Sequence, residues 1–417
     1  MAIHVDLVRT LKSQALEDPA RTRLWGRNLL VCGQVALSLV MLTIAVFLYR
    51  GFQAEVGSGA GFRTGRILTM GFQPDLAGYD GPRARRFYRT LKERAQTIAG
   101  VQSVALTSSL PMDAISIENT TVAPEGFTFP AGTESVRVRS AHVDEGYFDT
   151  LEIGIVGGRG FRSTDAEGRP RVAVVNQTFA ARYWPGQDVI GKRFRIVTGD
   201  RPWVEIVGLA ADHKHRAIAE APTEFVYYPL EQDAVLINKI VVASDSDAAA
   251  LTAPLRAVVR SIDPNMPIFD VRTMEDLYTS SAVTMSRLVV EVVGGMGATG
   301  LIMTIVGLYG LVAYSVSRRT REIGVRMAVG ASPALVLRMV LRHGALLALG
   351  GIVMGLVASA AIEGGLKAAF PFPNAPNLTL TTYLLVVPTV LMITLLAAYV
   401  PARRAARIDP LVAIRQE

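Results

Sequence analysis

The stretch "LLVCGQVALSLVMLTIAVFLY", residues 29–49, carries no charged side chain. A helix needs about 20 apolar residues to cross the hydrocarbon core of a bilayer, and this stretch has that length. A cleaved signal peptide is the alternative interpretation. It is disfavoured because the run is too long, a basic arm precedes it, and the residues that follow, Arg50-Gly-Phe-Gln, offer no small-residue cleavage site. The stretch is therefore expected to be a retained membrane anchor.

Three further apolar runs of spanning length occur later in the chain, at residues 288–316, 344–362 and 380–400. A long segment of mixed character, residues 50–287, separates the first run from the second. The sequence therefore predicts a membrane protein with four transmembrane helices and a large α+β extracytoplasmic domain inserted between helices 1 and 2. The only cysteine, Cys32, lies in the first run, so no disulfide can form within the chain.

The distribution of Lys and Arg predicts the orientation, because these residues are retained on the cytoplasmic side of spans. Basic residues gather in the N-terminal arm, in the segment between the second and third runs, and in the tail, whereas residues 363–379 contain only Lys367. Both termini are therefore expected in the cytoplasm of a cell whose inner membrane holds the chain. The expected segments are a basic amphipathic arm (1–28), spans (29–49, 288–316, 344–362, 380–400), an extracytoplasmic domain (50–287), a cytoplasmic basic coupling loop (317–343), a short extracytoplasmic loop (363–379) and a cytoplasmic tail (401–417).

The extracytoplasmic segment begins and ends with the same local pattern. "RILTMGF" (66–72), "RARRFYRTLKERAQTIA" (83–99) and "VQSVALTS" (101–108) read as strand, helix and strand, since the apolar residues of the middle piece recur at helical spacing. "KIVVAS" (239–244), "AAALTAPLRAVVRSI" (248–262) and "MPIFDVRT" (266–273) repeat this order. Short strands and turns fill the region between, which predicts one α+β domain with an insertion at about 111–235.

The sequence from Gly186 to Lys192 has the G-x-x-x-x-G-K spacing of a phosphate-binding loop. Such a loop continues with Ser or Thr and lies between a strand and a helix, whereas here Arg193 follows, a helical pattern precedes and a strand pattern comes after. The orientation also places this segment outside the cytoplasm. A Pro-Gly turn followed by a Gly turn is the favoured interpretation.

Two other groups of residues are possible sites. Asp212, His213 and His215 could ligate a metal, but a third strong ligand is missing, so a solvated basic loop is favoured. Glu145, Asp149 and Glu152 have the spacing of an ordinary solvated face, without a nucleophile or base beside them. The sequence thus predicts no catalytic residues, no cofactor and no metal, and an enzyme in this domain is the least favoured function.

The spans lack charge at membrane depth and are rich in glycine; Glu291 lies at the outer edge of the second span, one turn from Arg287, and is expected to form a surface ion pair. Small residues let helices approach closely in lipid, within one chain or across a dimer, and the candidates for this role are Gly297, Gly300, Gly307, Gly351 and Gly355. A channel or ion-coupled carrier usually places acids or bases within the membrane, so the uncharged spans disfavour that class.

The basic loop contains "RRTREIGVRMAVGAS" (318–332), a helix-compatible stretch that Gly330 and Pro333 interrupt, with Ser332 as the expected N-cap of the next helix. Apolar residues interleave with its arginines. Two interpretations remain open: a surface helix held by acidic lipid, or a docking element for a cytoplasmic partner.

This loop, the terminal "PARRAARIDPLVAIRQE" (401–417), "GLYGLVAYSV" (307–316) and the outside "VVNQTFAARYWPGQDVIGKRFRI" (174–196) resemble the permease subunits of the FtsX-like, MacB-type ABC transporter family. The FtsX-like region would cover about 288–410. The opening residues 5–31 resemble the junction between the halves of tandem-duplicated permeases in this family, so the chain is expected to be one half or a single-module relative.

The resemblance implies that two permease modules pair and that a separate ATPase docks beneath them, so that ATP hydrolysis occurs in another subunit and moves the extracytoplasmic domains. In this sequence the docking residues would be Arg318, Arg319, Arg321, Glu322, Arg326 and Met327. Expected partners are that ATPase, a second permease module, an envelope protein and membrane lipids, but no nucleic acid. An ATPase-independent membrane-anchored scaffold or regulator of envelope proteins is the alternative.

Overall fold

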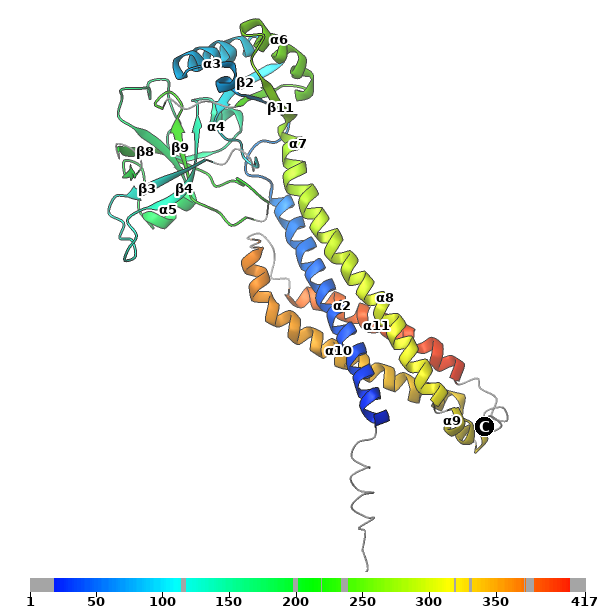
Figure 1. Cartoon of the computed structure of the whole chain (residues 1–417). Coiled ribbons are helices and arrows are strands. Elements are labelled where there is room, and N and C mark those ends of the chain that lie inside the picture. The colour runs from blue at the N-terminus through cyan, green and yellow to red at the C-terminus, as the bar shows by residue number, and fades with distance from the viewer. Residues whose placement is uncertain are drawn as a thin grey trace, which may run out of the picture. The chain divides into compact units, whose positions relative to one another are not determined.

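The computed structural model describes residues 19–113, 118–197, 202–218, 220–233, 239–318, 320–329, 332–370, 372 and 379–405 (Figure 1). The chain divides into two compact units. One comprises Met1–Gly51, Arg287–Phe370 and Ala375–Glu417, and the other comprises Phe52–Ser286 and Pro371–Asn374. Each unit is described separately below.

The first unit is helical. It contains most of α2 (Pro19–Ser58), nearly all of α8 (Met285–Arg318), the short α9 (Thr320–Ala328), α10 (Pro333–Ala369) and α11 (Thr379–Ala405). In the described part of the chain, four helices are long and apolar enough to cross a membrane: Gly26–Ser58, Arg287–Arg318, Pro333–Ala369 and Leu380–Arg404. The apolar runs of the sequence lie within these longer helices. The fold is therefore that of a four-span membrane protein.

The second unit is an α+β domain that occurs in the chain between α2 and α8. Its first part is an antiparallel sheet in the order β11-β1-β10-β2, formed by β1 (Ile67–Phe72), β2 (Val101–Thr107), β10 (Lys239–Ser244) and β11 (Ile268–Thr273). The helices α3 (Gly81–Ala95) and α6 (Thr252–Ile262) connect β1 to β2 and β10 to β11. This strand order is that of the split βαβ arrangement, and the strand–helix–strand pattern read from the sequence occurs at both ends.

The core of this part forms because each helix has one apolar face. Asp80 caps α3 by accepting a hydrogen bond from the Arg83 backbone N–H at 2.9 Å. The stripe of α3 that follows is buried against the sheet together with one face of α6, and Figure 1 shows the two helices side by side. Short 3₁₀ turns, η1 (Pro74–Ala77) and η2 (Ala248–Leu251), precede the two helices.

The second part of the domain is a ring of six strands. It contains β3 (Glu118–Pro124), β4 (Val136–Val143), β6 (Val172–Asn176), β7 (Arg193–Ile196), β8 (Trp203–Ala210) and β9 (Phe225–Pro229). The parallel pairing of β4 with β9 closes the ring, and β5 (Ile155–Gly158) adds to β8. Apolar side chains from all six strands and from α5 (Gln177–Tyr183) form its core. One pairing, Thr107 with Val143, joins the ring to the first sheet.

The ends of the expected insertion at about 111–235 lie beside residues 114–117 and 234–238, which are outside the described residues. Two short helices complete the domain: α4 (Tyr147–Thr150) follows β4, and α7 (Met274–Tyr278) follows β11. A π-helical segment, η3 (Thr279–Thr284), connects α7 to α8.

The prediction that the G-x-x-x-x-G-K stretch is a turn is confirmed. The helix α5 precedes it, capped by Asn176, whose Oδ1 accepts from the Phe179 backbone N–H at 3.1 Å. Gly186 and Gly191 adopt positive φ angles of 70° and 81°, and β7 begins at Arg193. This helix–turn–strand order is the reverse of a phosphate-binding loop.

Candidate coupling site at the short helix α9

The helix α9 lies in the chain between α8 and α10, and the start of α10 follows from local sequence. Pro333 occupies the first turn of α10 and Ser332 lies at its N-cap position, as the sequence predicts, although the Ser332 side chain makes no capping hydrogen bond. Within α9, Ile323 is buried, whereas Val325 on the same helix is about half exposed. A nine-residue helix is too short to be stable alone, so this apolar contact holds it in place.

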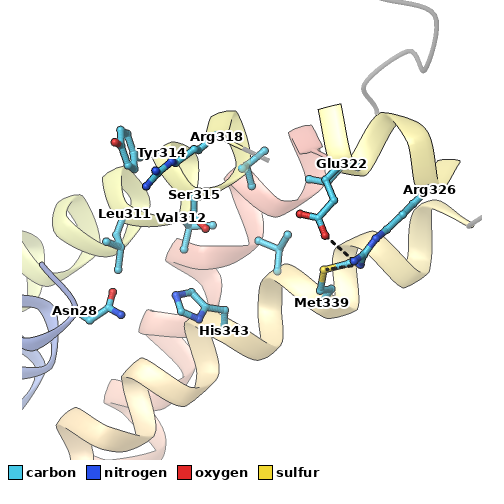
Figure 2. Close-up of a pocket in the computed structure, with 13 residues that line it drawn as sticks. Asn28, Leu311, Val312, Tyr314, Ser315, Arg318, Glu322, Arg326, Met339 and His343 are labelled. Atoms are coloured by element: carbon cyan, nitrogen blue, oxygen red, sulfur yellow. Dashed lines mark hydrogen bonds and ion pairs between the residues drawn. The ribbon is translucent and has the colours of Figure 1, made fainter. Parts of the chain in front are cut away.

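The charged side chains of α9 are accessible. Arg326 donates to the Oε1 of Glu322 at 2.6 Å, and both side chains are about half exposed, at 48% and 51%. Arg326 also lies 3.7 Å from the Sδ of Met339 on α10 (Figure 2). An exposed i,i+4 pair of this kind contributes only about 0.3–0.5 kcal/mol to helix stability. Its charges thus remain available to a partner at little cost to the helix.

The structure places the other expected docking residues as follows. Arg318 is the last residue of α8 and is exposed, and Met327 is half-buried in α9. Arg319 lies outside the described residues, and Arg321 belongs to α9 but its side chain is outside the described part. The structure therefore brings Glu322 and Arg326 together, and all six docking assignments stay proposals.

The five glycines expected at helix contacts lie where the helical unit is tightest. A Cβ on Gly300 would stand 2.9 Å from the Ser38 Oγ of α2, and one on Gly307 would stand 2.6 Å from the Gln34 Oε1. On α10, a Cβ on Gly351 would stand 2.5 Å from the Cβ of Val35. Gly297 and Gly355 make similar close approaches to α2. In this structure the five glycines thus face α2 within one chain, at distances where an added Cβ would require a neighbouring atom to shift.

A buried polar pair occurs in the α+β domain at the end of α2. The carboxylate of Glu55 is fully buried and lies 2.9 Å from the ammonium of Lys214. Removing one partner of a buried pair costs about 3–5 kcal/mol because an uncompensated charge remains. Lys214 follows β8 in the chain, and its backbone N–H donates to the Ala60 carbonyl at 3.0 Å. The last turn of α2 is therefore anchored to the domain.

Residues 211–217 are a loop, as expected, but the expectation that its histidines are solvated is wrong. His213 and His215 are each only 8% exposed, and their rings lie 4.0 Å apart, with His215 stacked on Phe225. Burial lowers the pKa of His213 to about 4, and its Nε2 lies 2.6 Å from the Tyr227 hydroxyl. The neighbouring Asp212 accepts from Asn176 and Thr178. Both histidines are thus neutral core side chains.

A second histidine site has the opposite charge state. His142 on β4 lies 3.2 Å from Glu118 and 3.4 Å from Asp233. Burial opposes its protonation, but the hydrogen bonds to Asp233 and Glu118 outweigh burial and raise the His142 pKa to about 9. The sequence did not single out His142 because its partners come from β3 and from the segment after β9.

Two of the three acids that the sequence places close together form ion pairs. Glu145 binds the Lys92 ammonium at 2.8 Å, and Glu152 binds Arg63 at 3.2 Å. Asp144, which the sequence pattern does not single out, contacts the same Lys92 ammonium as Glu145. Burial raises the pKa of Asp144 to about 6, although the Lys92 ammonium lies 2.7 Å from it. In the described residues no three His, Cys, Asp or Glu side chains gather into a metal-ligating group.

Comparison with known proteins shows two family models along the chain. The FtsX-like permease C-terminal model matches residues 294–410, and the MacB-like periplasmic core domain model matches residues 31–258. The first match includes α9, and the second includes the strand ring.

Curated relatives have low sequence identity to this chain. The macrolide export ATP-binding/permease protein MacB of Azoarcus sp. (strain BH72) is 25% identical, over 63% of this chain and 40% of the relative. The probable syringafactin export ATP-binding/permease protein SyfD of Pseudomonas syringae pv. tomato is 27% identical, over 68% of this chain and 44% of the relative. The chain thus spans less than half the length of these relatives.

Solved structures with a related region include the periplasmic region of MacB from Actinobacillus actinomycetemcomitans, with a TM-score of 0.37, 13% identity and coverage of 53% of this chain and 94% of that one. The extracellular domain of YknZ from Gram-positive bacteria has a TM-score of 0.33, 12% identity and coverage of 49% and 100%. Because the periplasmic core model matches more than half of the sequence and the permease model matches the last three spans, the chain belongs to the FtsX-like, MacB-type permease family.

Proposed function

We propose that this chain is a permease subunit of a MacB/FtsX-type ABC transporter, which converts the motion of a cytoplasmic ATPase into movement of an extracytoplasmic domain for export or mechanotransmission. The observation that carries the proposal is α9, a short helix between two candidate spans with a buried apolar anchor and exposed paired charges. The names of the relatives, which are export ATP-binding/permease proteins, support the same class.

The proposed input is contact of the ATPase with the exposed side of α9. Glu322 and Arg326 present both signs of charge about one helical turn apart, which suits a partner with complementary charges. Because α9 is anchored through Ile323, a push on its exposed face would act on the neighbouring helices. Arg318, Arg319, Arg321 and Met327 complete the proposed docking set.

The proposed output follows the chain into the α+β domain by two connections. The end of α2 is tied to the domain by the buried Glu55–Lys214 pair. On the other side, α7, η3 and α8 follow one another without a loop, and π-helical segments such as η3 are common at functional positions. Helical connections transmit displacement more directly than flexible loops do.

The remaining parts of the proposal concern orientation and partners. Both termini would lie in the cytoplasm of a cell whose inner membrane holds the four spans, since the basic segments favour this orientation. ATP hydrolysis would occur in a separate subunit, and a second permease module and an envelope protein would complete the assembly.

The test is co-purification of the tagged full-length chain from native membranes, with ATPases identified by mass spectrometry. Glu322→Arg and Arg326→Glu are each expected to reduce the co-purified ATPase at least about tenfold, since like charges across an interface are costly. The double variant restores an i,i+4 pair in reversed order. Docking predicts that it stays defective, because the partner would still meet the wrong charges.

The matched control is the pair Glu363 and Lys367 on α10, which has the same spacing and a 2.6 Å contact. Reversing both of its charges should leave ATPase recovery unchanged. If the Glu322/Arg326 double variant co-purifies as much ATPase as the wild type does, the pair only stabilises α9. If no ATPase co-purifies with the wild-type chain, the ATPase-independent scaffold or regulator replaces the present proposal.

A further inference from the structure

A cavity of about 410 Å³ lies in the helical unit, on the side of α9 that faces α8 and α10 (Figure 2). Small-molecule sites in proteins have volumes of roughly 300–1,000 Å³, so this cavity is large enough for an organic ligand. Its walls come from α2, α8, α9 and α10. The lining side chains that bear on a ligand belong to Leu311, Val312, Arg318, Glu322, Ile323 and Arg326.

The lining is divided between a buried apolar part and a charged rim. Leu311, Val312 and Ile323 are each less than 5% exposed and form the apolar part with their aliphatic neighbours. Arg318, Arg326 and Glu322 are exposed and lie at the rim. Such a division suits an amphiphilic ligand. A wholly polar ligand would leave the apolar wall without a partner, and a wholly apolar ligand would leave the rim arginines without a partner.

The rim carries an excess of positive charge. Glu322 is bonded to Arg326, whereas none of the carboxylates in the described part of the chain lies within 4.0 Å of the Arg318 guanidinium. A third arginine is close by, since the Arg27 guanidinium lies 4.4 Å from the ring centroid of Tyr314, a lining residue. The unneutralised charge at this end of the cavity favours an anion.

The position in the fold identifies the source of that anion. Arg318 ends the candidate span Arg287–Arg318, so the cavity lies where apolar helix surface gives way to a basic segment. Basic pockets between transmembrane helices bind the headgroups of anionic lipids, and each Lys or Arg near an anionic membrane surface contributes about 1 kcal/mol. We propose that the cavity holds one anionic phospholipid, with its phosphate on Arg318 and the start of an acyl chain along Leu311, Val312 and Ile323.

This lipid would support α9 from behind. The proposed ATPase contact uses mainly the exposed charges of Glu322 and Arg326, whereas the lipid would fill the space against Ile323. Of the proposed docking residues, Arg318 is the one that the lipid phosphate would also contact. The lipid site therefore does not depend on the existence of an ATPase, and the permease chain alone is sufficient to test it.

The experiment measures phospholipid bound to the purified full-length chain by native mass spectrometry, after reconstitution with phosphatidylglycerol or phosphatidylcholine. One phosphatidylglycerol per chain is expected to survive detergent washing, with phosphatidylcholine retained less. Arg318→Gln should lower phosphatidylglycerol occupancy about fivefold, the loss of one cationic contact, and Arg318→Lys should retain most of it. Because Arg318 is exposed at a helix end, these variants are expected to fold.

Arg338→Gln is the matched control, since Arg338 is an exposed arginine of α10 that does not line the cavity. Two results would indicate general annular lipid and overturn the proposal. One is an equal loss of bound phosphatidylglycerol in Arg318→Gln and Arg338→Gln, and the other is equal retention of phosphatidylglycerol and phosphatidylcholine. Displacement of the lipid by millimolar inorganic phosphate would overturn it in favour of a soluble-anion site.

Discussion

At the scale of single residues, the α+β domain contains buried titratable groups whose charge states are set by neighbours from distant parts of the chain. His142 is charged because two carboxylates contact it, whereas His213 is neutral because it is buried beside a tyrosine hydroxyl. A histidine side chain is thus charged at one site of the domain and neutral at another. The stability of the domain should therefore depend on pH in a way that can be assigned to individual histidines.

We expect His142 to stabilise the fold below neutral pH and to lose this effect in alkali. Its folded pKa of about 9 lies above its ordinary value of 6.5, so the folded state binds the extra proton between these limits. The contribution is therefore complete below pH 6.5 and is lost as pH rises through 9, and it amounts to at most roughly 3 kcal/mol. Thermal unfolding of the full chain, followed by fluorescence of the domain's buried Trp184, measures it.

His142→Gln removes the titration but preserves a side chain that can hydrogen-bond. The fall in unfolding temperature between pH 6 and pH 9 should be smaller in this variant than in the wild type. Equal falls in both proteins would show that His142 does not carry the pH dependence.

At the scale of elements, the helical unit depends on close contact between α2 and its neighbours. Gly300 and Gly307 of α8 accommodate the polar side chains of Ser38 and Gln34, and Ser38 lies 3.3 Å from the Thr304 hydroxyl. Gly351 of α10 accommodates Val35. These three glycines therefore allow close packing between α2 and its neighbours in the described structure.

Substitution of Gly351 should destabilise the helical unit. A Cβ at this position would lie 2.8 Å from the Cys32 carbonyl oxygen, which is backbone and cannot rotate away. Gly351→Leu is expected to cost about 1–3 kcal/mol through overpacking. The midpoint of thermal aggregation of the detergent-solubilised chain reports the change.

Gly364→Leu on the same helix is the control, because a Cβ at Gly364 would meet nothing within 4 Å. This variant should keep the wild-type midpoint. Similar losses for both variants would indicate a general effect of leucine on α10, and the proposed contact with α2 would then be wrong.

At the scale of the whole molecule, the proposed function requires that the strand ring and α9 lie on opposite sides of the membrane. Single cysteines test this once the native Cys32 is replaced by alanine. Gln187→Cys in the exposed turn before β7 should react with a membrane-impermeant maleimide in spheroplasts. Val329→Cys, at a position that is 84% exposed, should react only after lysis. Labelling of both positions in intact spheroplasts would contradict the orientation.

Much of the fold could be read from local patterns. The four spans follow from runs of uncharged residues, and the strand–helix–strand units follow from the spacing of apolar residues, because both signals lie within consecutive residues. The candidate site was also accessible in part: the i,i+4 spacing of Glu322 and Arg326 allows the pair that the structure contains. The turn at Gly186 was predicted for the same local reason.

The features that the sequence did not indicate arise from contacts between distant segments. The pairing of β4 with β9 closes the strand ring, Glu55 meets Lys214, and the histidines of the loop at 211–217 are buried against Phe225 and Tyr227. The cavity behind α9 likewise needs four helices to form. Burial and the proximity of charges determine the protonation and packing of these groups, and both quantities exist only once the chain has brought remote residues together.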